Sequence, residues 1–192
     1  MKKIILASNS PRRRELLKGL DVEYTVDTEN NFVESMDASV EAHQIPVLMS
    51  VGKSHGFHRD LNEDEVLITA DTVVIVGDEG DKVLGKPHSR EEAVDMLRIL
   101  SGRTHEVVTA VTVRDASREE TVTDSTLVTF ERLEDSEIEY YIEKYKPFDK
   151  AGAYGVQEWI GYVAISRLEG SFYNVMGFPV HKVYRELQKF LR

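Results

Sequence analysis

The first apolar segment of the chain leads directly into a predicted helix, and this junction constrains the fold more than any other feature. Ile4-Ile5-Leu6-Ala7 has the aliphatic, β-branched character of a buried strand. Ser10 then suits the N-cap of a helix, and Pro11 suits its first position. The apolar residues that follow at helical spacing are Leu16, Leu17 and Leu20. A strand followed at once by a helix indicates an α/β protein.

The first turn of this predicted helix is strongly basic, with Arg12, Arg13 and Arg14 in succession. Cations are unfavourable at this end of the helix dipole, where the first backbone N–H groups also lack helical acceptors. A bound anion makes the same surroundings favourable, because guanidinium groups and unpaired N–H groups both bind phosphate oxygens. The cluster therefore predicts a phosphate-binding site. The alternative is a solvated basic helix face.

Composition favours one enzyme-sized unit. A chain of 192 residues with 41% hydrophobic content can form the core of one domain or of two closely joined lobes. The net charge of −10 argues against a general nucleic-acid-binding surface, which needs a basic face. The chain has no cysteine, which excludes disulfides and thiolate metal sites. No apolar run has the length of a signal or membrane segment, so we expect a cytoplasmic protein without membrane or nucleic-acid partners.

Strands and helices alternate along the rest of the chain, with an antiparallel insert. The ranges predicted as strands are 22–26, 66–70, 72–76, 82–84, 106–113, 120–130 and 162–165. Helices are predicted to begin near Pro46, at capping boxes formed by Ser89 with Glu92 and by Ser136 with Glu139, and before Val183. The polar stretch 27–38 is predicted to be a loop over a site, and Gly77, Asp78 and Gly80 are predicted to form a turn.

Asp71 separates two β-prone runs, so its carboxylate is predicted at the end or at a bend of a segment otherwise suited to burial. Such a group can ligate a divalent cation or act as a general base on water. The alternative is a turn aspartate that accepts hydrogen bonds from nearby backbone N–H groups. Local sequence leaves both interpretations open.

Two further segments have features of a ligand site. Lys86 lies between Gly85 and Pro87, on a constrained turn where its charge can meet phosphate oxygens. The segment 149–157 contains small residues that permit close approach of a ligand, and it ends on Gln157, whose amide can donate and accept at a base edge. A plain turn is the alternative. The histidines lack zinc-site spacing, and neither a hydrolase triad order nor a Walker loop is present.

Motifs along nearly the whole chain resemble those of the Maf-like nucleoside triphosphate pyrophosphatases. They are LASNSPRRRELL at 6–17, ADTVV at 70–74, LGKP at 84–87, LSGRTH at 100–105, DKAGAYGVQ at 149–157 and NVMGFP at 174–179. The resemblance implies a single domain over residues 1–192, with the α/β fold shared by Maf-like proteins and inosine triphosphatases. In that fold two lobes are built on a long twisted mixed sheet around a central substrate cleft.

The resemblance also implies an activity. It is the hydrolysis of a nucleoside triphosphate to the monophosphate and pyrophosphate, with a divalent cation, Mg²⁺ or Mn²⁺, as cofactor. Asp71 would be the proton acceptor, and Glu34 and Asp71 would hold the metal. The substrate-binding residues implied are Ser8, Arg12, Arg13, Lys53, Thr72, Lys86 and Gln157.

Within the family, the DKAG segment and Gln157 resemble the branch that acts on dTTP and UTP. The alternatives are the branch that acts on 7-methyl-GTP and a non-hydrolysing nucleotide-sensing regulator of cell division. A homodimer is compatible with the sequence, although no motif calls for one. Trp159 is expected in the core, as is usual for a lone tryptophan near a strand. The alternative is a position at the border of the base pocket, where its ring would stack and change selectivity.

Overall fold

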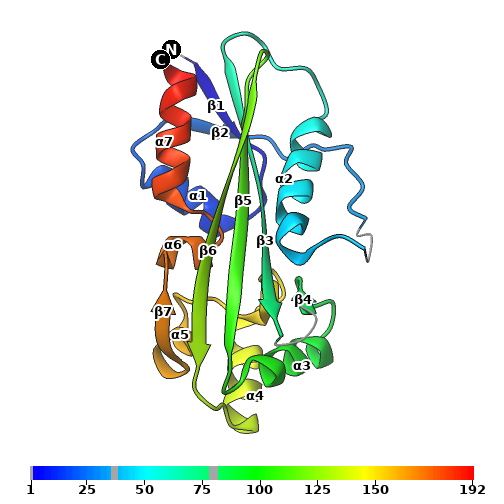
Figure 1. Ribbon diagram of the computed structural model, residues 1–192, viewed down its shortest axis with the longest axis vertical. Coiled ribbons are helices and arrows are strands. Elements are labelled where there is room, and N and C mark those ends of the chain that lie inside the picture. Colours follow the sequence, from blue (N-terminus) through cyan, green and yellow to red (C-terminus); the bar gives the residue numbers. More distant parts are fainter. Residues whose placement is uncertain (1, 36–38, 78–81) are drawn as a thin grey trace. The chain divides into compact units, whose positions relative to one another are not determined.

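The computed structural model describes residues 2–35, 39–77 and 82–192 (Figure 1). The chain divides into two compact units, which are described separately. Unit 1 comprises Met1–Asp71, Thr109–Asp124 and Gly177–Arg192, and unit 2 comprises Thr72–Val108 and Ser125–Met176. Asp78 and Gly80 of the predicted turn lie outside the described residues, as do residues 36–38 of the predicted loop.

The strands form one mixed sheet, and their residues are divided between the two units. The strands are β1 (Lys3–Leu6), β2 (Tyr24–Val26), β3 (Glu65–Val76), β4 (Lys82–Leu84), β5 (Thr104–Arg114), β6 (Glu119–Phe130) and β7 (Ile165–Glu169). Their order is β2-β1-β3-β5-β6-β7, and β4 pairs with β3. β1 is parallel to β2 and β3, whereas β3–β4 and β6–β7 are antiparallel. The predicted α/β class with a mixed sheet is confirmed.

The helices lie between the strands along the sequence and also follow the last strand. They are α1 (Pro11–Lys18), α2 (Ile45–His55), α3 (Arg90–Leu100), α4 (Asp135–Tyr145), α5 (Trp159–Val163), α6 (Phe172–Val175) and α7 (Val180–Leu191). Short 3₁₀ turns occupy Ala42–Gln44 and Ala151–Ala153. In the part of the chain that the structure describes, no helix has the length and apolar character needed to cross a membrane.

Unit 1 contains the parallel strands and the predicted phosphate helix. Ser10 caps α1 as expected, since its Oγ accepts a hydrogen bond from the Arg13 N–H at 3.5 Å. Buried polar contacts fasten α2 to the strands: Ser50 Oγ lies 2.9 Å from Thr112 Oγ1, and Thr69 Oγ1 donates to the Ser50 carbonyl at 2.7 Å. Figure 1 shows α2 (cyan) and α7 (red) on opposite sides of the unit 1 strands.

The core of unit 2 includes an aromatic cluster that contains a histidine. His105 lies edge-on to both Phe130 and Tyr154, with ring centroids 5.0 and 5.4 Å away. Its Nε2 is 2.7 Å from the Tyr154 hydroxyl, and the side chain is almost entirely buried. Burial lowers the pKa of His105 from its ordinary value of 6.5 to about 4. The folded protein therefore holds this ring neutral.

This burial predicts a pH-dependent stability. Between pH 6.5 and 4 the unfolded chain protonates His105 while the folded chain does not, so the free energy of unfolding falls as the pH decreases. We expect His105 to contribute about 2 kcal/mol to the loss between pH 7 and pH 5. Denaturant titrations of wild type and His105→Gln at both pH values measure this contribution. The exposed-residue control His88→Gln should keep the wild-type loss, and an equal loss in His105→Gln would contradict the prediction.

Three local predictions differ from the structure. Asp71 lies inside the continuous strand β3 rather than at its end or at a bend, because both flanking runs belong to one strand. α4 begins two residues earlier than the Ser136 box predicts, because Glu134 and Glu137 form the capping box instead. Residues 162 and 163, predicted to begin a strand over 162–165, belong to α5 instead, and β7 begins at Ile165. A Cβ on Gly161 would lie 1.8 Å from the Val156 carbonyl oxygen, so only glycine permits this close packing.

The expectation for Trp159 is also wrong. Its side chain is only partly buried, at the first position of α5, and its ring packs edge-on against Tyr140 with centroids 4.9 Å apart. The strand that the core expectation assumed next to it begins later, at Ile165. The tryptophan therefore covers a helix surface instead of filling the core.

Candidate active site

A carboxylate in the middle of a buried strand is the first element of the candidate site. Asp71 follows six buried residues of β3, and its own side chain remains 19% exposed. An ionised group in such a strand requires a partner, since desolvation of an unpaired charge is costly. The partner is Lys53 of α2, whose Nζ donates to Asp71 Oδ1 at 2.7 Å.

Lys53 also binds the second predicted acid. Its Nζ lies 2.8 Å from Glu34 Oε1, so one ammonium group joins two carboxylates that are 37 residues apart (71 − 34) in the sequence. Lys53 is 22% exposed and Glu34 is 60% exposed, so the pair opens toward solvent on the Glu34 side. The three residues predicted from the family resemblance therefore do meet, within unit 1.

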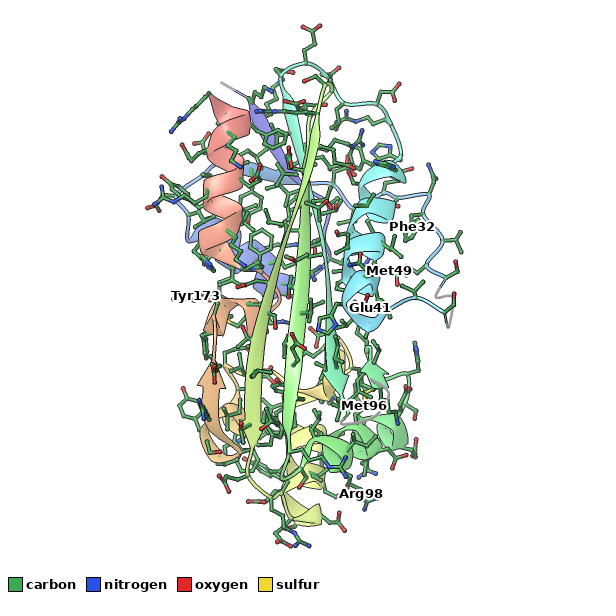
Figure 2. All side chains as sticks on the ribbon, in the orientation of Figure 1. Phe32, Glu41, Met49, Met96, Arg98 and Tyr173 are labelled. Atoms are coloured by element: carbon green, nitrogen blue, oxygen red, sulfur yellow. The ribbon has the colours of Figure 1, made fainter. Side chains whose placement is uncertain are left out.

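The loop that carries Glu34 is held on α2 by a contact that the sequence reasoning missed. Phe32 packs across the helix where Gly52 has no side chain: a Cβ there would lie 2.3 Å from the phenyl ring. Figure 2 shows Phe32 beside α2. Asn30 adds a hydrogen bond from its side-chain amide to the Lys53 carbonyl at 2.7 Å. The signal in the sequence is the glycine pair Gly52 and Gly56 at helical spacing.

Arg13 joins three segments of unit 1 at the N-terminal turn of α1. Its Nε donates to the Gly177 carbonyl at 2.9 Å, and Nη1 donates to the Ala70 carbonyl at 2.9 Å. Nη1 also reaches Ser8 Oγ at 3.5 Å. Ala70 directly precedes Asp71, so the guanidinium group is fixed next to the candidate base. Burial lowers the pKa of Arg13 to about 10, an effect opposed by Asp71 and increased by Arg12.

Ser8 and Arg14 complete the turn before α1. The buried Ser8 Oγ accepts a hydrogen bond from the Ser10 N–H at 3.2 Å. Arg14 donates from Nε and Nη2 to the Ser8 carbonyl, each at 3.3 Å. Arg13 and Arg14 therefore both bind backbone carbonyls, a structural role that the phosphate interpretation of the arginine cluster did not include.

The remaining predicted residues belong to unit 2. Thr72 follows Asp71 in β3, Lys86 lies between β4 and α3, and Gln157 lies just before α5. Within this unit the Gly152 N–H donates to the Gly85 carbonyl at 3.0 Å, which brings the turn of Lys86 next to the glycine-rich segment. Gly152 has φ +68, and a Cβ there would lie 2.9 Å from Val74. Substrate contacts by these residues stay predictions.

The geometry of unit 1 suits acid–base chemistry on an anionic substrate. It offers a carboxylate able to accept a proton, a second carboxylate beside it, and cationic groups on two elements, α1 and α2. Among the residues that the structure describes, no three His, Asp or Glu side chains gather in the manner of a closed metal cage. A cation here would rely on few protein ligands.

Comparison with known families decides the classification. The model of the family described as "Maf-like protein" matches residues 3–190. The chain belongs to the Maf-like protein family. The match covers every motif that carried the resemblance in the sequence, and the resemblance is therefore confirmed.

Several curated proteins are similar to this Maf-like chain over nearly its full length. A Porphyromonas gingivalis protein named dTTP/UTP pyrophosphatase is 50% identical over 190 residues, covering 98% of this chain and 94% of the relative. Proteins of the same name from Parabacteroides distasonis and Bacteroides thetaiotaomicron are 47% and 49% identical; they cover 98% and 97% of this chain, and 96% and 95% of the relatives. Among solved structures, the Staphylococcus aureus Ham1 protein matches with a TM-score of 0.43 at 14% identity, over 67% of this chain and 72% of that one.

Proposed function

We propose that this chain, acting as one domain over residues 1–192, is a cytoplasmic pyrophosphatase that hydrolyses dTTP and UTP. The products are the nucleoside monophosphate and pyrophosphate. The observation that carries the proposal is the convergence of Asp71 and Glu34 on the Lys53 ammonium group in unit 1. The names of the relatives, at 46–50% identity, support the choice of substrates.

The same donor set fits a divalent cation. Two carboxylates that already share one positive charge suit a small oxygen-loving ion such as Mg²⁺ or Mn²⁺. Magnesium in nucleotide enzymes commonly uses one or two carboxylates and takes its other ligands from phosphates and water. We therefore propose Asp71 and Glu34 as the metal ligands. When bound, the cation supplies positive charge that polarises the phosphate oxygens.

The residues of unit 1 divide the proposed reaction among them. Asp71 accepts the proton of a water molecule as the water oxygen bonds to the α-phosphorus. The bond from that phosphorus to the bridging oxygen breaks, and its electron pair leaves with pyrophosphate. When Asp71 and Glu34 hold the cation, the Lys53 ammonium group can turn to the leaving pyrophosphate and offset its charge. Arg12, Arg13 and the start of α1 bind phosphate oxygens. Ser8 adds a hydroxyl contact.

In unit 2, we propose that Thr72, Lys86 and Gln157 contact the substrate, a role supported by the motifs in which they occur. Lys86 provides charge for phosphate oxygens, and Gln157 provides an amide for the base edge. The proposal does not include a homodimer, because no feature of the described residues calls for one.

The proposal is tested by measuring pyrophosphate release from dTTP, UTP, CTP, 7-methyl-GTP and ITP, each with Mg²⁺, with Mn²⁺ and with a chelator. We expect release from dTTP and UTP that depends on the metal. Preferential release from 7-methyl-GTP would replace the proposal by the other branch of the family. Tight nucleotide binding without release from any substrate would favour a sensor.

Replacement of Glu34 tests the metal assignment separately. Glu34→Gln keeps the size of the side chain but removes one anionic ligand, so we expect the metal concentration for half-maximal turnover to rise about 10-fold. The rate at saturating metal should change much less. The control is Glu63→Gln, at an exposed acid on the loop before β3, which should need the same metal concentration for half-maximal turnover as wild type. An unchanged metal titration in Glu34→Gln would remove Glu34 from the site.

A further inference from the structure

A compact polar network surrounds the turn that leads to Gln157 in unit 2. The Tyr141 hydroxyl of α4 donates to Glu158 Oε2 and accepts a hydrogen bond from the Gly155 N–H at 3.0 Å. The other carboxylate oxygen, Glu158 Oε1, lies 3.0 Å from Lys150 Nζ. The Glu158 N–H donates to the Gly155 carbonyl at 3.0 Å and closes the turn. Gln157 is the residue within that closed turn that directly precedes Glu158.

The network is buried and paired, which makes it rigid. Tyr141 is fully buried, Lys150 is 8% exposed, and the Glu158 side chain is 19% exposed. Lys150 has a second carboxylate partner, since its Nζ also lies 2.8 Å from Asp149 Oδ1. Loss of Glu158 leaves the buried Tyr141 hydroxyl without its acceptor, and such a group is costly in free energy. Burial and the contact with Glu158 raise the pKa of Tyr141, so its hydroxyl stays protonated as the donor.

Gly155 shows how closely the acid packs over the turn. A Cβ at this position would lie 2.9 Å from Glu158 Cδ and 3.0 Å from Lys150 Cε. The ion pair therefore occupies the space that a side chain would fill. The turn and the Glu158–Lys150 pair fit each other, and a change in one displaces the other.

Gln157 itself has a feature that calls for a ligand. Its Oε1 is buried and accepts no hydrogen bond from the described residues. A buried acceptor without a donor is unfavourable, and the cost is removed when a bound molecule supplies an N–H group. Gln157 Oε1 is thus the atom of this turn that can accept a hydrogen bond from a bound ligand.

We propose that Glu158 is a positioning residue, which through Tyr141 and Lys150 holds Gln157 Oε1 to accept the N3–H of a uracil or thymine base. This inference rests on the proposed function, because it assigns the base contact of the same substrates. Uracil and thymine carry a hydrogen on N3, whereas N3 of cytosine is an acceptor. A fixed carbonyl oxygen therefore favours the first two and repels the third.

Selectivity, rather than rate alone, tests the proposal. In Glu158→Ala we expect the ratio of kcat/KM for UTP over CTP to fall at least about 10-fold, mainly through a higher KM for UTP, while kcat for UTP changes by less than about three-fold. Tyr141→Phe should shift the ratio in the same direction, and Glu158→Gln, which can still accept from Tyr141, should shift it less. The exposed control Glu143→Gln on α4 should match wild type.

Binding of UMP and CMP, followed by calorimetry on the same variants, separates this inference from the proposed function. A wild type that does not hydrolyse UTP overturns the function, and the ratio of the UMP and CMP dissociation constants then still tests the positioning role. Thermal unfolding identifies any variant that fails to fold, and Glu158→Gln and Tyr141→Phe are the milder replacements. An unchanged UMP-to-CMP ratio in folded variants overturns the inference.

Discussion

Asp71→Asn is expected to lower kcat for dTTP by about 10²- to 10⁴-fold, the usual range for loss of a general base. Asparagine has the shape of aspartate but cannot accept the proton of the attacking water. The neutral amide also weakens the contact with Lys53, whose Nζ donates to Asp71 Oδ1 at 2.7 Å. Initial rates of pyrophosphate release at saturating dTTP and metal measure the effect.

Nucleotide affinity and fold should survive this replacement. Asp71 lies in the long strand β3, and asparagine fills the same space, so dTTP binding should stay within several-fold of wild type. Asp95→Asn, at an exposed position of α3, is the matched control and should turn over dTTP normally. A rate for Asp71→Asn close to that of wild type would remove Asp71 from the mechanism.

Arg13→Lys is expected to damage both activity and stability. Lysine keeps the charge but has a single nitrogen, so it loses the fork geometry in which Arg13 Nε donates to the Gly177 carbonyl and Nη1 to the Ala70 carbonyl, at 2.9 Å each. We expect the free energy of unfolding to fall by about 2 kcal/mol, and kcat/KM for dTTP to fall about 100-fold because the part of β3 around Asp71 is no longer fixed.

Denaturant titration and steady-state kinetics on the same preparation separate the two effects. Arg185→Lys, an exposed exchange on α7, is the control and should leave both quantities unchanged. Full stability combined with full activity in Arg13→Lys would show that the guanidinium contacts with the two carbonyls are dispensable.

Local signals in the sequence were sufficient for much of the fold. The cap at Ser10 and the position of Pro11 place α1, and Ser89 caps α3 by accepting from the Glu92 N–H at 3.1 Å. Each of these signals acts within one helical turn. The helix at 159–163 was missed because it depends on the fit of Gly161 against the backbone of Val156, a contact that strand propensity does not register.

The candidate site was predictable as a set of residues but not as a geometry. The family motifs supplied Asp71, and looser resemblance supplied Glu34 and Lys53, yet no pattern in the sequence indicates that one ammonium group joins the two acids. That arrangement depends on how Phe32 seats against Gly52, a packing contact between a loop and a helix. The network around Glu158 was missed for the same reason, since its members come from α4 and from two sides of a turn.

The most direct test of the central claim is the identity of the products formed from dTTP with Mg²⁺, separated by chromatography and quantified. We expect dTMP and pyrophosphate in equal amounts, with neither formed when a chelator removes the metal. Formation of dTDP and inorganic phosphate, or of no product at all, would contradict it.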